Sequence, residues 1–405
     1  MMYLKWGVHY FLGFLLVLTA HQAIAQQQQN TLWDNTVKQA TKQVVYFNAW
    51  GGSHEVNRYI FWVGQQVKRR YGITLKHVKV DDISQVVSRL LVEKTAGRDT
   101  EGKIDLLWVN GENFATLKNN NLLYGPFSQS LPNYQWVDES KPSVKRDFST
   151  PVEYMEAPWG MAHLVFYYDS SVLRQPPMSM EALLDYAKQH PGRITYPNPP
   201  HFLGTTFLKQ VLLELASSPE LLQKPVSQVD FAEVTAPLWK FLDQLHPVSW
   251  RQGKAFPANS SQMRQMLDSG ELHVSFSFSP SEASNSIQAG LLPDTVKSYV
   301  HNGGTLGNTH FLAIPYNAKA KAAAQVVVNF LLSAEAQSQK MDPVIWGDPT
   351  VLAIDRLPEG QQTMFARFEE MPAMLTSIQR GKPLPEPHFS WTEALEKAWL
   401  KRYQQ

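Results

Sequence analysis

Residues 44–57 read VVYFNAWGGSHEVN, and this stretch decides how the rest of the chain is interpreted. Val44 to Trp50 is an apolar run of strand length, the two glycines form a turn, and a helix is predicted from His54 to Tyr71. Gly72 ends that helix, and residues 73–80 alternate apolar and polar side chains as a second strand would. A strand, a helix and a second strand in this order are typical of an α/β protein with a parallel sheet.

The same alternation continues through most of the chain. A helix is predicted around Ile83 to Leu91, because its apolar residues fall on one face, and residues 104–109 form a buried strand. Apolar residues 164–168 follow Pro158-Trp159-Gly160 and indicate a crossing into a second lobe. Further helices are expected at 180–190, 205–216, 231–245 and 318–337, further strands at 193–196, 273–278 and 310–314, and a Pro-rich tail at 372–399 that packs outside.

The prediction for the whole chain is an α/β fold of two lobes joined by a hinge, each lobe a mostly parallel sheet flanked by helices. The length of 405 residues supports two lobes, because a single core seldom serves so many residues. The expected division is a signal peptide at 1–25, a tether at 26–43, lobe 1 at 44–160, lobe 2 at 161–304, a return to lobe 1 at 305–345, and a C-terminal helical segment at 346–405.

The N-terminus and the composition indicate a secreted protein. Lys5, the apolar run from Tyr10 to Ala20 and the sequence Ala23-Ile24-Ala25 predict a cleavable secretory signal, since the run is too short to span a bilayer. Removing it takes one Lys from 37 basic residues against 36 acidic ones, which leaves no net formal charge to attract nucleic acid. The chain has no Cys, so a lipid-modified cysteine, a disulfide and a thiolate metal site are excluded.

Three stretches together resemble the type-two extracellular solute-binding proteins of ABC importers, a family with thiamine-, polyamine-, iron- and maltose-binding members. They are VYFNAWGGSHEVN at 45–57, GKIDLLWVNGENFATLKNNNLLY at 102–124 and PWGMAHLVFYYDSSVL at 158–173. The Trp-Gly-Gly-Ser turn, the Trp-Val-Asn-Gly-Glu-Asn turn and the late Gly-Gly-Thr-Leu-Gly-Asn segment are most similar to the YnjB-like branch of that family.

The resemblance implies a periplasmic binding protein fold of type two, in which the lobes close on a small polar molecule. It also implies a monomer in the periplasm whose partners are a membrane permease and an ATPase. The physical reason for a cleft is that loops at the carboxyl ends of parallel strands converge on one crevice. Closing two such edges around a ligand buries most of its surface.

In lobe 1, candidate ligand-binding residues follow the first and third strands. Gly51 and Gly52 would let the backbone approach a ligand, and Glu112 would favour a cation, although Asn and Gly are also ordinary turn residues and Ser and Glu ordinary helix caps. Trp159 could stack on a flat ligand or pack a core. The candidates here are Trp50, Gly51, Gly52, Ser53, Asn57, Asn110, Glu112, Asn113 and Trp159.

In lobe 2 and the return crossing, candidates again lie in loops and at expected helix starts. Thr205 and Thr206 would present hydroxyls toward an anionic or hydroxylated ligand, with simple helix capping as the alternative. The charge of the ligand therefore stays open between a cation and an anion. The candidates are Tyr196, Thr205, Thr206, Ser277, Glu282, Thr305 and Asn308.

A secreted hydrolase with a carboxylate-based active site is the competing function. The sequence has no Gly-x-Ser-x-Gly motif, and His54-Glu55 lacks a second histidine four residues on, where Arg58 stands. Adjacent Tyr167 and Tyr168 invite a ferric site, but neighbours on a strand point to opposite faces. We therefore expect no catalytic residue, no cofactor and no metal.

Overall fold

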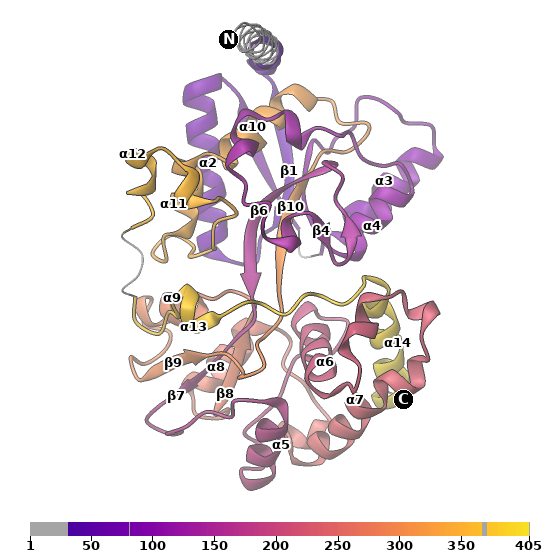
Figure 1. Cartoon of the computed structure of the whole chain (residues 1–405), viewed down its shortest axis with the longest axis vertical. Coiled ribbons are helices and arrows are strands. Elements are labelled where there is room, and N and C mark those ends of the chain that lie inside the picture. Colours follow the sequence, from indigo (N-terminus) through magenta and orange to yellow (C-terminus); the bar gives the residue numbers. More distant parts are fainter. Residues whose placement is uncertain (1–30, 81, 367–370, 405) are drawn as a thin grey trace, which may run out of the picture.

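The computed structural model describes residues 31–80, 82–366 and 371–404, which form two lobes stacked along the long axis of the molecule (Figure 1). The predicted signal peptide lies outside these residues. Within the described ranges, no helix is long and apolar enough to cross a membrane.

The first lobe is built on a five-stranded mixed sheet in the order β2-β1-β3-β10-β6. Its strands are β1 (Val44–Trp50), β2 (Thr74–Val80), β3 (Leu106–Val109), β6 (Glu156–His163) and β10 (Gly307–Ala313). β1 is parallel to β2 and β3, whereas β10 runs antiparallel to β3 and β6. The carboxyl ends of β1 and β3 therefore share one edge, and Figure 1 shows that this edge faces the second lobe.

Helices cover both faces of this sheet. One core joins β1 to α2 (His54–Tyr71) and α10 (Lys321–Leu331), and another joins β3 to α3 (Ser84–Thr95) and α4 (Glu112–Asn119). α2 forms where the sequence predicts it because Ser53 accepts a hydrogen bond from the amide of Val56 and Gly72 ends the helix at φ 70°.

The second lobe has a three-stranded sheet in the order β8-β7-β9. Both outer strands, β8 (Val274–Ser277) and β9 (Val296–Tyr299), run antiparallel to β7 (Val165–Asp169). The expectation of a mostly parallel sheet is therefore wrong for this lobe, because β7 leaves the hinge while both of its neighbours return toward it. The surrounding helices are α5 (Met180–Gln189), α6 (Phe202–Leu215), α7 (Phe231–Leu245), α8 (Ser260–Asp268), α9 (Glu282–Gln288) and α14 (Ser390–Tyr403).

Three chain segments lie side by side where the lobes join. The amide of Leu164, between β6 and β7, donates to the carbonyl of Leu306 at 2.7 Å, and the amide of Leu384 donates to the carbonyl of Thr305 at 2.8 Å. Gly307 lies close to Pro383: a Cβ added at Gly307 would overlap the proline ring. These segments form the hinge, and the chain from α13 (Ser377–Arg380) to α14 runs along it, between the two lobes (Figure 1).

The expectation that the Pro-rich tail packs outside is wrong. Trp391 and Trp399 of α14 are fully buried in the core of the second lobe. Residues 346–365 instead pack on the first lobe, where Trp346, Val351 and Phe365 join its core. The C-terminal segment is thus divided between the lobes, and Pro383, Pro385 and Pro387 lie in the stretch between α13 and α14.

Two other elements differ from the sequence prediction. Residues 193–196 form no strand, because they make only single backbone hydrogen bonds, from Trp250 to Ile194 and from His273 to Arg193, instead of a ladder. The helix expected at 318–337 is two helices, α10 and α11 (Ala334–Met341), since Ser333 caps a new helix by accepting from the amide of Ala336.

Candidate functional site

The loop after β1 contributes an exposed tryptophan to the edge that faces the second lobe. The side chain of Trp50 is 43% exposed, and its ring lies so close to Gly52 that an added Cβ there would overlap it. Ser53 caps α2, and Asn57 donates through Nδ2 to the carbonyl of Gly51 at 2.9 Å. Ser53 and Asn57 therefore shape the loop, while the Trp50 ring is exposed and Oδ1 of Asn57 has no hydrogen-bond partner among the described residues.

The loop after β3 brings a carboxylate to the same edge. Gly111 adopts φ 64°, and its amide donates to Oδ2 of Asp147 at 2.8 Å. Glu112 begins α4, and Asn113 donates to it at 3.3 Å. Burial raises the pKa of Glu112 above its usual value, while the charge of Lys209 on the second lobe lowers it. Glu112 thus lies within electrostatic reach of the opposite lobe.

Lys209, Phe148 and Glu386 join the two lobes at this place. Lys209 Nζ lies 3.1 Å from Oε2 of Glu386 and 4.5 Å from the centre of the Phe148 ring. Asn308, at the start of β10, donates to Oε1 of Glu386 at 3.0 Å. Residues of lobe 1, lobe 2, β10 and the stretch between α13 and α14 therefore meet at one contact point.

Several carboxyl groups lie near Lys209 at this contact point. Burial raises the pKa of Asp147 well above its usual value, and the negative charges of Glu112 and Glu386 raise it further. The pKa of Glu396, which accepts from Thr205 at 2.7 Å, is also raised, mainly by burial. This side of the cleft therefore holds ionisable groups that titrate above the usual range for carboxylic acids.

The second lobe adds an aromatic side chain and a polar bridge. Phe202, the first residue of α6, is 46% exposed and packs at 5.3 Å against the ring of Phe278, just after β8. At the start of α9, Ser281 donates through Oγ to the carbonyl of Trp346 on lobe 1 at 2.7 Å. Asn285 donates to the same carbonyl at 3.0 Å. Both lobes thus provide polar and aromatic groups to the surfaces that face each other.

Comparison with known proteins agrees with the family resemblance found in the sequence. Residues 62–353 match the family model described as bacterial extracellular solute-binding protein. The protein YnjB of Escherichia coli K12 is 45% identical over 391 residues, which cover 96% of this chain and 98% of the relative. The chain belongs to the bacterial extracellular solute-binding protein family.

Solved structures share the fold at low sequence identity. The spermidine/putrescine ABC transporter substrate-binding protein PotD of Streptococcus pneumoniae superposes with a TM-score of 0.61 at 16% identity, covering 88% of this chain and 99% of that one. The periplasmic binding protein AfuA of Actinobacillus pleuropneumoniae, solved with fructose-6-phosphate, gives 0.62 at 12% identity, covering 90% and 99%.

Several predicted site residues of this solute-binding protein serve its lobes instead of the cleft. Tyr196 is fully buried and bonds to His246 at 2.7 Å and to Trp399 at 2.8 Å inside lobe 2. Thr205 and Thr206 lie one turn inside α6, because the helix begins at Phe202, and their hydroxyls bond to Glu396 and to a backbone carbonyl. The prediction that they present free hydroxyls at a helix start is wrong.

Trp159 is also a core residue. It is fully buried, and its ring centre lies 4.8 Å from that of Trp108 and 5.3 Å from that of Trp346. This places Trp159 in the aromatic cluster of lobe 1. Of the two roles expected from the sequence, stacking on a ligand and packing in a core, the structure shows core packing.

The remaining candidates have partners near the hinge. Ser277 accepts from the amide of Ser279 at 3.1 Å, and Glu282 pairs with Arg264 at 3.0 Å. Thr305 donates to the carbonyl of Leu164 at 2.6 Å, so its hydroxyl holds two crossing segments together. Tyr167 and Tyr168 belong to different clusters of the second lobe, as expected for neighbours on a strand. No group of three metal-ligating side chains occurs among the described residues.

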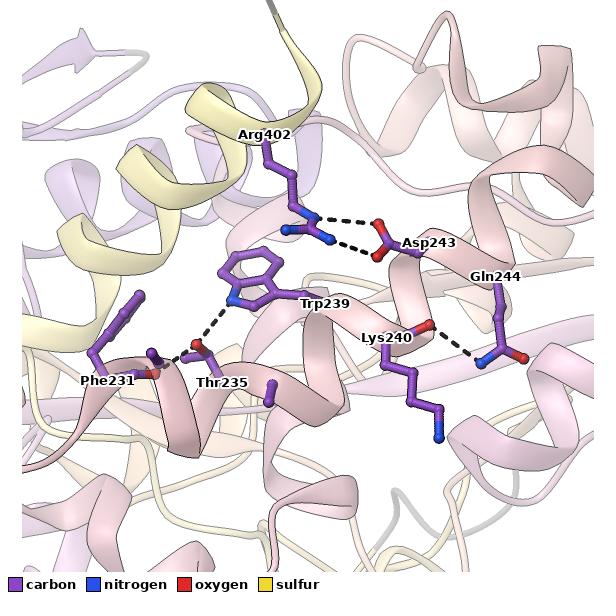
Figure 2. A pocket seen from close by; sticks show the side chains of 9 residues that line it. Phe231, Thr235, Trp239, Lys240, Asp243, Gln244 and Arg402 are labelled. Carbon is purple, nitrogen blue, oxygen red and sulfur yellow. Dashed lines mark hydrogen bonds and ion pairs between the residues drawn. The ribbon is translucent and has the colours of Figure 1, made fainter.

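Two cavities of the solute-binding protein lie away from the cleft. Figure 2 shows one of about 570 Å³ on the outside of lobe 2, where Trp239 of α7 donates to Thr235 and Arg402 of α14 pairs with Asp243. The other, about 470 Å³, is lined by lobe 1 residues such as Trp33 and Tyr134.

Sequence reasoning missed Asp147, Phe148, Lys209 and Glu386. One signal was available: Lys209 stands alone as a charge in the apolar stretch FLGTTFLKQVLL of α6. A lone Lys on a buried helix needs a carboxylate partner, but the sequence does not say that the partner is Glu386 in the tail.

Proposed function

We propose that this protein is the periplasmic solute-binding component of an ABC importer, which captures a small polar molecule between its lobes and delivers it to a membrane permease driven by an ATPase. The observation that carries the proposal is the contact point at which Lys209 of lobe 2, Phe148 of lobe 1 and Glu386 of the tail meet. These three groups lie far apart in sequence and meet at the place where the two lobes face each other.

The chemistry of the facing surfaces fits capture of a polar solute. Trp50 and Phe202 expose large aromatic faces, which can cover an apolar part of a solute or stack on a ring. Glu112 and the neighbouring carboxyl groups offer acceptors for hydroxyl or amine groups. Mostly apolar and aromatic walls with a small number of polar groups are the usual composition of a small-molecule site.

The relatives support the choice of importer. PotD of Streptococcus pneumoniae is named as an ABC transporter substrate-binding protein, and AfuA as a periplasmic binding protein. We extend that role, the periplasmic location, a monomeric state and the absence of catalysis to this chain, and we leave its solute to experiment.

The first experiment identifies the solute. Native mass spectrometry of the freshly purified protein should reveal a bound small molecule. Denaturation releases this molecule, and calorimetry then measures its binding to the refolded protein. Thiamine compounds, polyamines, sugars, ferric ion and oxoanions form the comparison panel for a thermal-shift screen. A solute at a hundred times its Kd adds about 2.7 kcal/mol to the free energy of unfolding, enough to shift the melt.

Variants then locate the binding site. Trp50→Ala should weaken solute binding with little change in the melting temperature of the empty protein, because the ring is already exposed. Phe61→Ala is the control, since Phe61 is 68% exposed in the middle of α2, away from the loop that contains Trp50. Equal effects of the two variants would argue against the cleft. Conversion of the released solute by the purified protein would favour the hydrolase instead.

A further inference from the structure

Arg380 stands apart from the other buried cations of the described chain. Lys209 pairs with Glu386, Lys340 with Asp348 and Arg264 with Glu282. The guanidinium of Arg380 is half-buried at the end of α13 and has no carboxylate partner among the residues that the structure describes. Its hydrogen bond goes to the carbonyl of Leu375 at 2.6 Å. Most of its five N–H donors are therefore available.

Arg380 lies at the hinge. Four residues further along, Leu384 is bonded to both Thr305 and Gly307 of the return crossing. Figure 1 shows α13 at the level where the two lobes meet. The positive charge of Arg380 also acts on the ring of His163, the last residue of β6. His163 pairs with Gly307 across the sheet, and the amide of Gly307 donates to the carbonyl of Leu384 at 3.0 Å, so β6 and the segment that follows Arg380 meet at the hinge.

His163 supplies an independent sign of a missing ligand. It is 6% exposed, and its Nε2 atom has no hydrogen-bond partner among the described residues. Burial, helped by Arg380, lowers its pKa to about 4, so the ring is neutral at physiological pH. A neutral imidazole has one nitrogen that donates and one that accepts, so Nε2 can meet a donor or an acceptor group of a ligand. Buried polar atoms without partners are rare and call for an explanation.

We infer that Arg380 and His163 form an anion-binding subsite at the hinge, which takes a carboxylate or a phosphate group of the captured solute. The inference rests on the proposed function. A guanidinium can donate two parallel hydrogen bonds to either group, and its desolvation is offset only when the anion arrives. In one tautomer Nε2 of His163 accepts from a hydroxyl beside the carboxylate, and in the other it donates to an oxygen of the anion.

The rest of the cleft fixes the orientation of such a solute. Burial raises the pKa of the carboxyl groups of Glu112 and Asp147, so this side of the cleft disfavours a further negative charge. The anionic end of the solute therefore lies toward Arg380, and a neutral or cationic end lies toward Glu112.

The test uses inorganic phosphate and acetate as probes, with ionic strength held constant by chloride. Either probe should raise the melting temperature of the wild-type protein and fail to raise that of Arg380→Gln, with Arg380→Lys intermediate. Lys382→Gln is the matched control: Lys382 is exposed two residues away and should respond like the wild type. Phosphate alone would indicate a phosphate group, and acetate alone a carboxylate. No rise with either probe, or an equal rise in Arg380→Gln, would overturn the subsite.

The solute released from the purified protein separates this inference from the proposed function. Arg380→Gln should weaken its binding by about tenfold or more, the usual effect of losing a charge-assisted hydrogen bond, while the urea midpoint of the empty protein is unchanged. Unchanged affinity in Arg380→Gln would refute the subsite and leave the binding function intact. Absence of any bound or binding solute would instead refute the binding function itself.

Discussion

At the scale of single residues, Gly160 in β6 allows a buried ion pair to form against the sheet. A Cβ added at this position would overlap Oδ2 of Asp348, Nε2 of His310 and Nζ of Lys340. Lys340 and Asp348 are both buried and paired, and His310 lies 3.1 Å from the same carboxylate oxygen. A buried pair of this kind tolerates no displacement, because separating the partners leaves unpaired charges in the core.

Gly160→Ala should therefore lower the free energy of unfolding by about 1 to 3 kcal/mol, the usual cost of overpacking, or by more if the ion pair separates. The matched control is Gly303→Ala, where an added Cβ meets nothing within 4 Å. Urea unfolding measures both variants. Similar urea midpoints for the two variants would show that the sheet accommodates the added methyl group without loss of stability.

Glu112 gives a residue-scale prediction about pH. Its pKa is raised in the folded state, chiefly by burial, so the folded protein binds this proton more tightly than the unfolded chain does. The free energy of unfolding then falls as pH rises through the folded pKa. Glu112→Gln removes the ionisation, so the variant should be more stable than wild type at pH 7.5, with the difference vanishing near pH 4.

Glu153→Gln serves as the comparison, because Glu153 is exposed at the surface. Urea unfolding at both pH values should show little pH-dependent change for it. A Glu112→Gln advantage that persisted undiminished at pH 4 would rule out ionisation as the cause.

At the scale of elements, α14 completes the second lobe. Trp399 is fully buried and donates through Nε1 to the hydroxyl of Tyr196. Trp399→Ala should lower the free energy of unfolding by about 3 to 5 kcal/mol, because it leaves a cavity and removes one of the two hydrogen bonds of the Tyr196 hydroxyl. Lys397→Ala, on the exposed side of the same helix, should change it little. Thermal melts and urea unfolding compare the two, and equal stability would exclude α14 from the core.

The elements also show where sequence reasoning succeeds and where it fails. The bounds of α2 and α7 agree with the prediction, since a cap or a clear apolar period marks them. Residues 193–196 looked like a strand because Ile194 and Tyr196 are apolar and buried, yet no neighbouring strand pairs with them. The prediction merges α10 and α11 because no Gly or Pro stands between them, and only the cap at Ser333 separates them.

At the scale of the whole molecule, solute binding should draw the lobes together. Ser149 of lobe 1 and Gln223 of lobe 2 approach within 2.9 Å. Because the chain has no Cys, Ser149→Cys with Gln223→Cys can be joined by a short bis-maleimide at this one place. The cross-linked fraction should rise when the released solute is added, and the joined protein should exchange labelled solute more slowly. Cross-linking that ignores the solute would mean that the lobes do not close, and each single-cysteine variant controls for side reactions.

The site could be predicted only in part, for a reason that belongs to the whole molecule. Trp50 and Glu112 were found because each follows a strand of the predicted sheet, where loops converge. Lys209 and Glu386 are 177 positions apart, and their contact depends on the path of the tail. No local pattern encodes that path, so the residues that join the lobes appear only in the folded chain.

The division of the tail has a consequence for how the protein is made. Lobe 1 takes residues from before and after lobe 2, and lobe 2 receives Trp391 and Trp399 from the last helix of the chain. Synthesis runs from the N-terminus, so α14 and these two tryptophans emerge after the other core residues of lobe 2. Until then lobe 2 lacks part of its core, and a prematurely ended chain has exposed apolar surface there. Completion of the lobe 2 core thus depends on a helix that is synthesised after the rest of both lobes.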